Sequence, residues 1–290
     1  MYIATLIAKP NQLDPALVTS IRDAWGGGDA LWLAPDEAAE FPLEREPANL
    51  WDVWESCQAI GKDLIVQPQE NRRKKMLLAD MDSTMIEQEC IDELADFVGV
   101  GARVKDITAR AMNGELDFEA ALIERVGLLK GQPASIIEDV LQSRITLMPG
   151  GATLLATMKA HGAHAALVSG GFTAFTSKVA AMLGFDEHRA NTFIIEDNRL
   201  TGDVGRPILG RDAKVQALSE ITTRLGLSSE DVIAVGDGAN DLGMLQAAGT
   251  GVAAHAKPAV AAQVAVRINH GDLTALLYLQ GYAKADFVLA

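Results

Sequence analysis

The chain has 290 residues, of which 49% are hydrophobic, and its formal net charge is −14. This length and composition suit one large or two smaller domains with packed cores. The acidic balance argues against binding to nucleic acid or to anionic membranes, since both need basic patches. Every apolar run is much shorter than a membrane span, and an anionic substrate would have to be attracted by local cations.

The two cysteines, Cys57 and Cys90, form neither a metal-binding pattern nor a disulfide framework. We interpret them as free thiols of a reducing compartment, because disulfides are rare in the cytosol. The N-terminus lacks a basic segment followed by an apolar one, so we expect no signal peptide and a cytoplasmic location.

Residues 1–70 are predicted to form a small α+β domain of their own. One helix should begin after Asp14 and end before three glycines, and another should follow Asn49, which can cap its first turn. The predicted strands are 2–8, 31–33, 39–43 and 64–66, and the helices are 15–25 and 50–60. This βαββαβ order resembles the ferredoxin-like ACT modules that bind small molecules. The alternative is an accessory or dimerisation domain, through which the protein could form a homodimer.

A polar segment, residues 67–75, follows this domain and contains the basic run Arg72-Arg73-Lys74-Lys75. Basic runs can indicate nucleic-acid binding. In so acidic a protein we interpret the run as part of a solvated linker to a second domain, residues 75–290.

Strand–helix alternation over residues 75–290 predicts a doubly wound parallel α/β sheet. Residues 86–146 interrupt it with four helical patterns, which predict a helical cap that excludes water and contacts the substrate. The predicted strands are 76–79, 163–168, 232–235, 251–254 and 266–269, with an edge hairpin over 192–204. The predicted helices are 89–98, 104–112, 118–129 and 136–143 in the cap, and 152–161, 172–183, 212–225, 242–248 and 259–265 elsewhere.

Two carboxylates, Asp80 and Asp82, directly follow the apolar strand 76–79. Like charges this close resist joint ionisation unless a cation or a division of roles removes the conflict. Phosphoryl transfer through an aspartyl-phosphate needs one carboxylate as nucleophile and another as general acid and base, with a hard divalent cation beside them. An Asx-rich turn after the strand is the alternative.

Two further predicted strands end in residues that can bind phosphate or metal. Ser169-Gly170-Gly171 follows one of them, Gly236–Asp241 follows the other, and Lys214 lies in the helix between them. Ligands of parallel α/β sheets bind at the carboxyl ends of the strands. The order of nucleophilic Asp, Ser, Lys and paired Asp resembles the four motifs of the haloacid dehalogenase superfamily of phosphohydrolases.

Further segments extend this resemblance to the phosphoserine phosphatase family of that superfamily, over about residues 75–280. The segments are Asp80–Thr84, Glu89–Glu93, Met112–Phe118, Arg125-Val126, Leu128–Lys130, Ser169–Phe172 and Gly236–Asp241. The resemblance implies Mg²⁺-dependent hydrolysis of O-phospho-L-serine to L-serine and phosphate, the last step of the phosphorylated route to L-serine. A phosphotransferase acting on another hydroxyl amino acid, such as homoserine, and a non-catalytic amino-acid sensor are the alternatives.

The resemblance assigns the catalytic roles. Asp80 is the nucleophile and Asp82 the general acid and base, and Lys214 brings positive charge to Asp80 and to the phosphoryl oxygens. Mg²⁺ is expected on Asp80, Asp237 and the backbone carbonyl of Asp82. Asp241 is expected to orient metal-bound waters or Lys214. Taken alone, Lys214 would be a surface lysine of a helix.

Phosphate contacts are expected from the Ser169 hydroxyl and from the Gly170 N–H at a helix N-terminus. Ser169 could instead cap that helix. Asn240 is a further phosphate or backbone contact.

The cap should recognise the amino-acid end of the substrate. The resemblance places Glu89 on the ammonium and Arg125 on the carboxylate, with Met112 and Phe118 as the walls of the site. Without it, the first two would be surface charges and the last two core residues.

Overall fold

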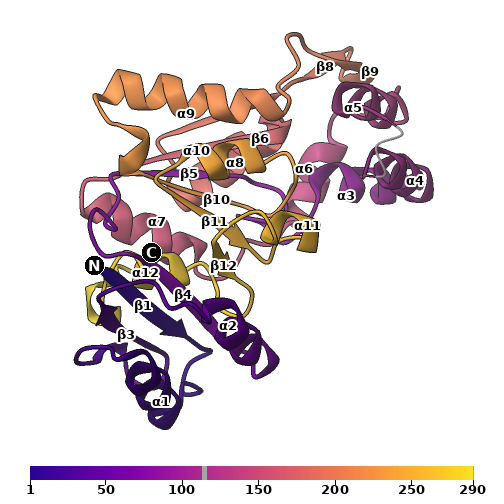
Figure 1. Cartoon of the computed structure of the whole chain (residues 1–290). Helices are drawn as coiled ribbons and strands as arrows, with labels where there is room; N and C mark the ends of the chain where they lie inside the picture. The colour runs from indigo at the N-terminus through magenta and orange to yellow at the C-terminus, as the bar shows by residue number, and fades with distance from the viewer. Residues whose placement is uncertain (113–115, 290) are drawn as a thin grey trace.

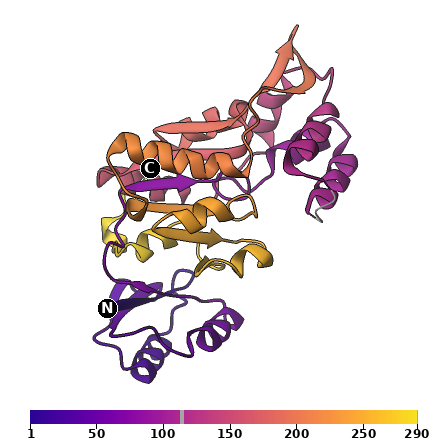
Figure 2. The same cartoon turned by 45° about the horizontal axis from the view of Figure 1, so that its top comes forward.

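The computed structural model describes residues 1–112 and 116–289, apart from the side chains of residues 109, 111 and 112. Figure 1 shows three parts: a small antiparallel sheet with two helices at the bottom, a parallel sheet flanked by helices in the middle, and a group of helices on the right. Figure 2 shows the same arrangement after a 45° turn. Below, the first part is the N-terminal unit (residues 1–68), the helical group is the cap, and the rest from Met76 onward is the main unit.

The N-terminal unit is the ferredoxin-like fold that the sequence predicts. Its antiparallel strands have the order β2-β3-β1-β4, and both helices pack against one face of the sheet. The elements are β1 (Tyr2–Ile7), α1 (Pro15–Trp25), β2 (Leu31–Ala34), β3 (Ala38–Leu43), α2 (Leu50–Ala59) and β4 (Asp63–Pro68). Asp14 caps α1 by accepting a hydrogen bond from the Ala16 N–H (2.8 Å), and Gly26 ends this helix in the left-handed conformation (φ 65°).

Asn49 is the N-cap residue of α2, as predicted, but its side chain does not cap the helix. Its side chain makes no cap hydrogen bond to α2, and its Oδ1 accepts a hydrogen bond from Nε1 of Trp25 (3.0 Å). The indole N–H at the end of α1 thus takes the acceptor that the first turn of α2 could have used.

The second face of the N-terminal sheet packs on the main unit. Ile7, Ala38 and Ile65 share a buried core with Tyr278 of α12 (Ala275–Leu279), a short helix that the sequence did not predict. Asp63, at the start of β4, accepts hydrogen bonds from three successive backbone N–H groups, those of residues 269–271. The homodimer suggested by the sequence stays a prediction, and it would have to use a surface other than this face.

The predicted solvated linker is wrong for two of its basic residues. Arg72 forms two hydrogen bonds with the carboxylate of Glu40 on β3. Lys74 is buried, and its Nζ donates to the carbonyl of Glu230 (2.7 Å). These cations therefore connect the segment to both units.

The main unit contains the predicted doubly wound parallel sheet, with the strand order β12-β11-β10-β5-β6-β7. Helices α7, α8 and α12 pack on one face of the sheet, and α9, α10 and α11 pack on the other. The strands are β5 (Met76–Ala79), β6 (His164–Phe172), β7 (Glu187–Asn191), β10 (Val232–Gly236), β11 (Thr250–Ala254) and β12 (Val266–Ile268). The flanking helices are α7 (Gly151–Ala160), α8 (Thr173–Leu183), α9 (Arg211–Leu225), α10 (Leu242–Ala247) and α11 (Pro258–Ala261).

Two strands of the main unit differ from prediction. β6 continues through Ser169 to Phe172, because Phe172 still pairs with Asn191 of β7. β7 itself was missed, since its sequence, Glu187–Asn191, is polar and this edge strand has only one neighbour. The hairpin of β8 (Phe193–Glu196) and β9 (Arg199–Val204) is present, but it forms a separate sheet and not the edge of the main one.

Among the described residues, the cap consists of four helices between β5 and α7. They are α3 (Cys90–Phe97), α4 (Gly101–Met112), α5 (Phe118–Gly127) and α6 (Ile136–Ser143). An antiparallel bridge between Ile86 and Leu147 joins the two ends of this insertion. The β8–β9 hairpin contacts the cap, where Leu200 exchanges backbone hydrogen bonds with residues 131 and 132. Within residues 1–112 and 116–289, no helix combines the length and apolarity needed to cross a membrane.

Candidate active site

The candidate site lies at the carboxyl ends of three adjacent strands, β6, β5 and β10. β5 is central: the chain adds β6 and β7 on one side of it, and later adds β10, β11 and β12 on the other. This reversal of strand order is the switch point at which such sheets bind ligands. Asp80 directly follows β5, and its N–H donates to the carbonyl of Val235 on β10 (3.0 Å). This bond fixes the backbone of Asp80 at the sheet edge.

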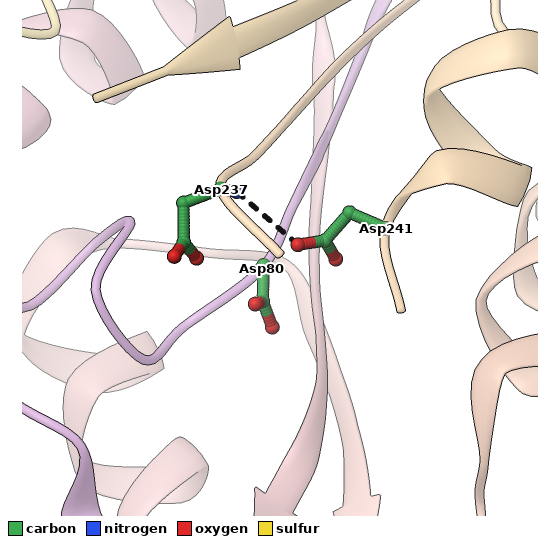
Figure 3. Close-up of side chains that lie close together, drawn as sticks. All are labelled: Asp80, Asp237 and Asp241. Carbon is green, nitrogen blue, oxygen red and sulfur yellow. Dashed lines mark hydrogen bonds between the residues drawn. The ribbon is translucent and has the colours of Figure 1, made fainter. Parts of the chain in front are cut away.

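Lys214 on α9 connects two carboxylates inside this edge. Its Nζ lies 2.6 Å from Oδ1 of Asp80 and 2.5 Å from Oδ1 of Asp241. The lysine side chain is only 2% exposed, so the ion pairs are shielded from water. The other oxygen of Asp241 accepts the N–H groups of Asp237 (3.2 Å) and Gly238 (2.9 Å), the first of which Figure 3 shows as a dashed line.

Three buried carboxylates gather here, those of Asp80, Asp237 and Asp241 (Figure 3). Each offers an oxygen that lies within 4.8 Å of the others. Lys214 supplies one buried positive charge for the three of them, and the partly exposed Lys257 reaches only 4.0 Å from Asp237. The cluster therefore has an excess of negative charge, and its oxygen donors are those that a hard cation prefers.

The pKa values reflect this crowding. Burial raises the pKa of Asp80 well above its usual range, and the charge of Asp241 adds to this while Lys214 opposes it. Burial likewise raises the pKa of Asp237 to about 6, helped by Asp241 and Glu89. Burial alone would lower the pKa of Lys214, but the carboxylates of Asp80 and Asp241 raise it well above normal. The lysine is therefore charged at neutral pH.

Asp82 faces the cap. Its Oδ1 accepts the backbone N–H of Cys90, the first residue of α3 (3.1 Å). Its Oδ2 lies so close to Gly171 that a Cβ on this glycine would be 2.8 Å away. Burial raises the pKa of Asp82 to about 7, the charge of Glu89 adds to this, and the hydrogen bonds from Cys90 oppose it.

Ser169 and Gly170 lie inside β6, so the expectation that Gly170 is at a helix N-terminus is wrong. α8 begins at Thr173, and its N-cap residue is Phe172. Ser169 is buried and does not cap this helix. Its Oγ accepts the N–H of Gly171 (2.8 Å), which leaves the hydroxyl hydrogen free to donate.

Asn191 and Thr84 are polar residues of the site that sequence reasoning missed. The Nδ2 of Asn191 donates to the carbonyl of Gly170 (2.9 Å), and its Oδ1 accepts the N–H of Leu209 (2.7 Å). Thr84 donates to Oδ1 of Asp237 (3.4 Å). Thr84 could have been noticed because it belongs to the segment 80–84, whereas Asn191 lies in the strand that was not predicted.

The cap reaches the sheet edge through Phe118, the first residue of α5. A Cβ on Gly170 would lie 3.2 Å from Cζ of Phe118 and 3.9 Å from Nδ2 of Asn240. Phe118 and Asn240 thus flank the same stretch of β6. The side chain of Met112, predicted to be another wall, lies outside the described residues.

Glu89 and Arg125 are both half-buried on the cap. An oxygen of Glu89 accepts the hydroxyl of Ser83 (2.8 Å). Nε of Arg125 donates to the carbonyl of Ala121 in its own helix (3.2 Å), and in the described part of the chain its guanidinium forms no ion pair. Burial lowers the pKa of Arg125, while the charges of Asp92, Glu89 and Asp82 oppose this. Asp92 was missed because it looks like one more acidic residue in the first turn of α3.

The sequence that forms the cap and most of the main unit matches a known protein family. Residues 77–246 match the haloacid dehalogenase-like hydrolases, and the chain belongs to this family. Over 204 residues it is 47% identical to the phosphoserine phosphatase of Haemophilus influenzae. That alignment covers 70% of this chain and 65% of the relative, so the chain spans less than two thirds of the relative's length.

Solved structures agree with this relationship. A haloacid dehalogenase family hydrolase from Salmonella enterica serovar Typhi has a TM-score of 0.87 and 34% identity, with 96% of this chain and 98% of that chain covered. A substrate-bound phosphoserine phosphatase complex has a TM-score of 0.67 and 40% identity, covering 71% and 97%. The first of these relatives includes the N-terminal unit, whereas the second covers a smaller share of this chain.

Proposed function

We propose that the protein hydrolyses O-phospho-L-serine to L-serine and phosphate through an aspartyl-phosphate on Asp80, with Mg²⁺ as cofactor. One observation carries this proposal: a buried Asp80–Lys214 pair lies at the switch point of the sheet. Beside it is Asp82, whose carboxyl group is close enough to feel the opposite charges of Glu89 and Arg125 on the cap. The similarity to phosphoserine phosphatases supports the choice of substrate.

Asp80, Asp237 and the backbone carbonyl of Asp82 would hold Mg²⁺. The surplus of buried carboxylates fits such an ion, and when bound it would neutralise charge on the phosphoryl oxygens. Asp241 already accepts Lys214 and two backbone N–H groups. We therefore assign it the role of orienting Lys214 and the loop of Asp237.

Lys214 orients the nucleophile. Because its Nζ binds Oδ1 of Asp80, the second oxygen of Asp80 remains available to attack phosphorus. The same ammonium, together with the hydroxyl of Ser169 and the N–H of Gly170, would stabilise the negative charge on the transferred phosphoryl group.

Asp82 moves the protons. A pKa of about 7 lets its carboxyl group carry a proton at neutral pH. It would donate this proton to the serine oxygen as the phosphorus–oxygen bond breaks. As a carboxylate it would then take a proton from the water that hydrolyses the aspartyl-phosphate.

The cap would select the amino-acid end of the substrate. The guanidinium of Arg125 has donors left for a bidentate bond to the substrate carboxylate. Glu89 would bind the ammonium, and Phe118, packed over Gly170, would exclude water from the phosphoryl group. We place this reaction in the cytoplasm, as the last step of L-serine biosynthesis, where the free thiols Cys57 and Cys90 stay reduced.

Phosphate release from a panel of small phosphoesters, with Mg²⁺ or with a chelator, tests the proposal. We expect phosphoserine to give the highest kcat/KM, and we expect activity to disappear in the chelator and return with Mg²⁺. A second arm adds homoserine and measures phosphohomoserine, which a phosphotransferase would form. Equal rates on all esters, transfer to homoserine, or turnover unaffected by the chelator would each contradict the proposal.

A further inference from the structure

The carboxylate of Asp82 is held from two sides by groups that belong to different parts of the fold. On one side is the backbone N–H of Cys90 at the start of α3 (3.1 Å). On the other side is Gly171 on β6, where a Cβ would lie 2.8 Å from Oδ2 of Asp82 and 3.0 Å from Oγ of Ser169. Asp82 itself lies in the loop after β5, so cap, loop and sheet meet at this one side chain.

The first N–H group of α3 binds a side chain from outside the helix. The first N–H groups of a helix have no partner within the helix, and an N-cap side chain usually accepts one of them. Glu89 is the N-cap residue here, but its side chain makes no cap hydrogen bond and accepts the hydroxyl of Ser83 instead. Asp82, eight residues before the first residue of α3, accepts the N–H of Cys90 in its place.

We propose that the N–H of Cys90 and the bare Cα of Gly171 are positioning groups that aim the carboxyl group of Asp82 at the leaving oxygen. This rests on the proposed function, in which Asp82 is the general acid. Oδ1 is fixed by the cap helix, and Oδ2 remains on the side of Ser169, where the phosphoryl group would lie. The capping bond also frees Glu89 for the substrate. Any movement of α3 away from the sheet would release the acid, so proton donation requires the cap in this position.

Proline at position 90 removes the N–H without removing the helix. Position 90 is the first residue of α3, where proline is favoured because its missing N–H has no partner within the helix. Proline also needs an extended residue before it, and Glu89 already has φ −95° and ψ 110°. Cys90→Ala is the matched control, since it keeps the N–H and removes only the thiol.

The measurement is kcat/KM on aryl phosphates of graded leaving-group acidity. These substrates lack the ammonium and carboxylate, so a disturbed Glu89 or Arg125 cannot affect the comparison. The slope of log kcat/KM against the pKa of the leaving group is the quantity compared. This slope is steeper for an enzyme without its general acid, because a poor leaving group needs the proton and a good one does not. Asp82→Asn sets the slope expected when the acid is lost.

We expect Cys90→Pro to lose about 10- to 100-fold on the poorest leaving group and less than about 3-fold on the best. Cys90→Ala should keep the wild-type slope. Gly171→Ala, which displaces Asp82 from the opposite side, should steepen the slope as well, and it tests the proposal even if the proline variant does not fold. A general structural defect would lower all substrates in parallel.

The outcomes distinguish the acid role of Asp82 from its positioning by Cys90 and Gly171. If Asp82→Asn leaves the slope unchanged, the acid role in the proposed function fails, and the positioning proposal fails with it. If Asp82→Asn steepens the slope but neither Cys90→Pro nor Gly171→Ala does, only the positioning proposal is overturned. A slope in Cys90→Ala as steep as in Cys90→Pro would also overturn it, because the thiol and not the N–H would then hold Asp82.

Discussion

The charged groups at the sheet edge bind one another, whereas Glu89 and Arg125 on the cap make few bonds within the described part of the protein. Lys214 is in contact with two carboxylates at 2.6 and 2.5 Å. Among the described residues, the Arg125 side chain has one hydrogen bond, to a carbonyl of its own helix, and that of Glu89 has one, to a serine hydroxyl. Under the proposed function, the phosphoryl end of the site would be assembled before substrate arrives, while Glu89 and Arg125 would remain available for the substrate.

Asp80→Asn should give the largest effect, because the sheet edge would keep its shape and lose its proposed nucleophile. We expect kcat for phosphoserine to fall by about 10⁴-fold or more, with no acid-stable phosphoenzyme after rapid quenching. Asp29→Asn, a matched change on an exposed residue of the N-terminal unit, should have no such effect. Substantial turnover by a folded Asp80→Asn protein would refute the mechanism.

Lys214→Met tests whether the sheet edge is held together by its ion pairs. It would leave the carboxylates of Asp80 and Asp241 buried without their shared cation. Breaking a buried pair in this way typically costs about 3–5 kcal/mol, which denaturant unfolding in a chelator would measure. The double variant Lys214→Met/Asp241→Asn should recover part of the loss. An unchanged free energy of unfolding in the single variant would contradict the comparison.

Arg125→Ala tests the other side, where the ligand and not the protein should complete the pair. We expect kcat/KM for phosphoserine to fall, with a loss of transition-state stabilisation of about 2–5 kcal/mol, the range for truncating one partner of a buried charge pair. An aryl phosphate, which has no carboxylate, should be affected far less, and stability should change little. Arg103→Ala, on the exposed surface of α4, is the control. If the two substrates fell in parallel, Arg125 would be structural only.

Glu89→Gln should show the same selectivity with a smaller loss. The amide can still accept a hydrogen bond from the ammonium and from Ser83, so only the charge is lost. We expect a loss of transition-state stabilisation of about 1–2 kcal/mol in kcat/KM for phosphoserine, and little change for an aryl phosphate. Steady-state kinetics on both substrates measure this, and a loss larger than that of Arg125→Ala would reverse the order we assign to the two cap charges.

Much of the fold follows from local pattern. The apolar runs of β1, β5 and β10, the cap on α1 at Asp14 and the glycine that ends it are short-range signals, and they appear in the structure where predicted. β7 and α12 were missed because they depend on contacts with distant segments and not on local pattern. β7 is a polar edge strand that is defined by pairing with β6, and α12 is a five-residue helix held by packing against the N-terminal sheet.

The site shows the same division. The strands next to Asp80, Ser169 and Asp237 can be located from their apolar sequences. That these residues lie close together also follows, because a parallel sheet brings the carboxyl ends of its strands to one edge. The acceptors of the Lys214 ammonium, the contact of Asn191 with Gly170 and the bond from Cys90 to Asp82 join residues on different elements. Nothing in the local pattern around these residues indicates such partners.

By itself, then, the sequence determined the order of strands and helices, the family, and the residue types available at the sheet edge. Only the tertiary structure decided that Arg72 and Lys74 connect the segment between the units to both of them, that the N-terminal sheet buries its second face on the main unit, and that the N–H of Cys90 on cap helix α3 binds Asp82. The physical reason is range. Propensity and periodicity act over a few neighbouring residues, whereas ion pairs, burial and shared hydrogen bonds depend on which distant segments the folded chain brings together.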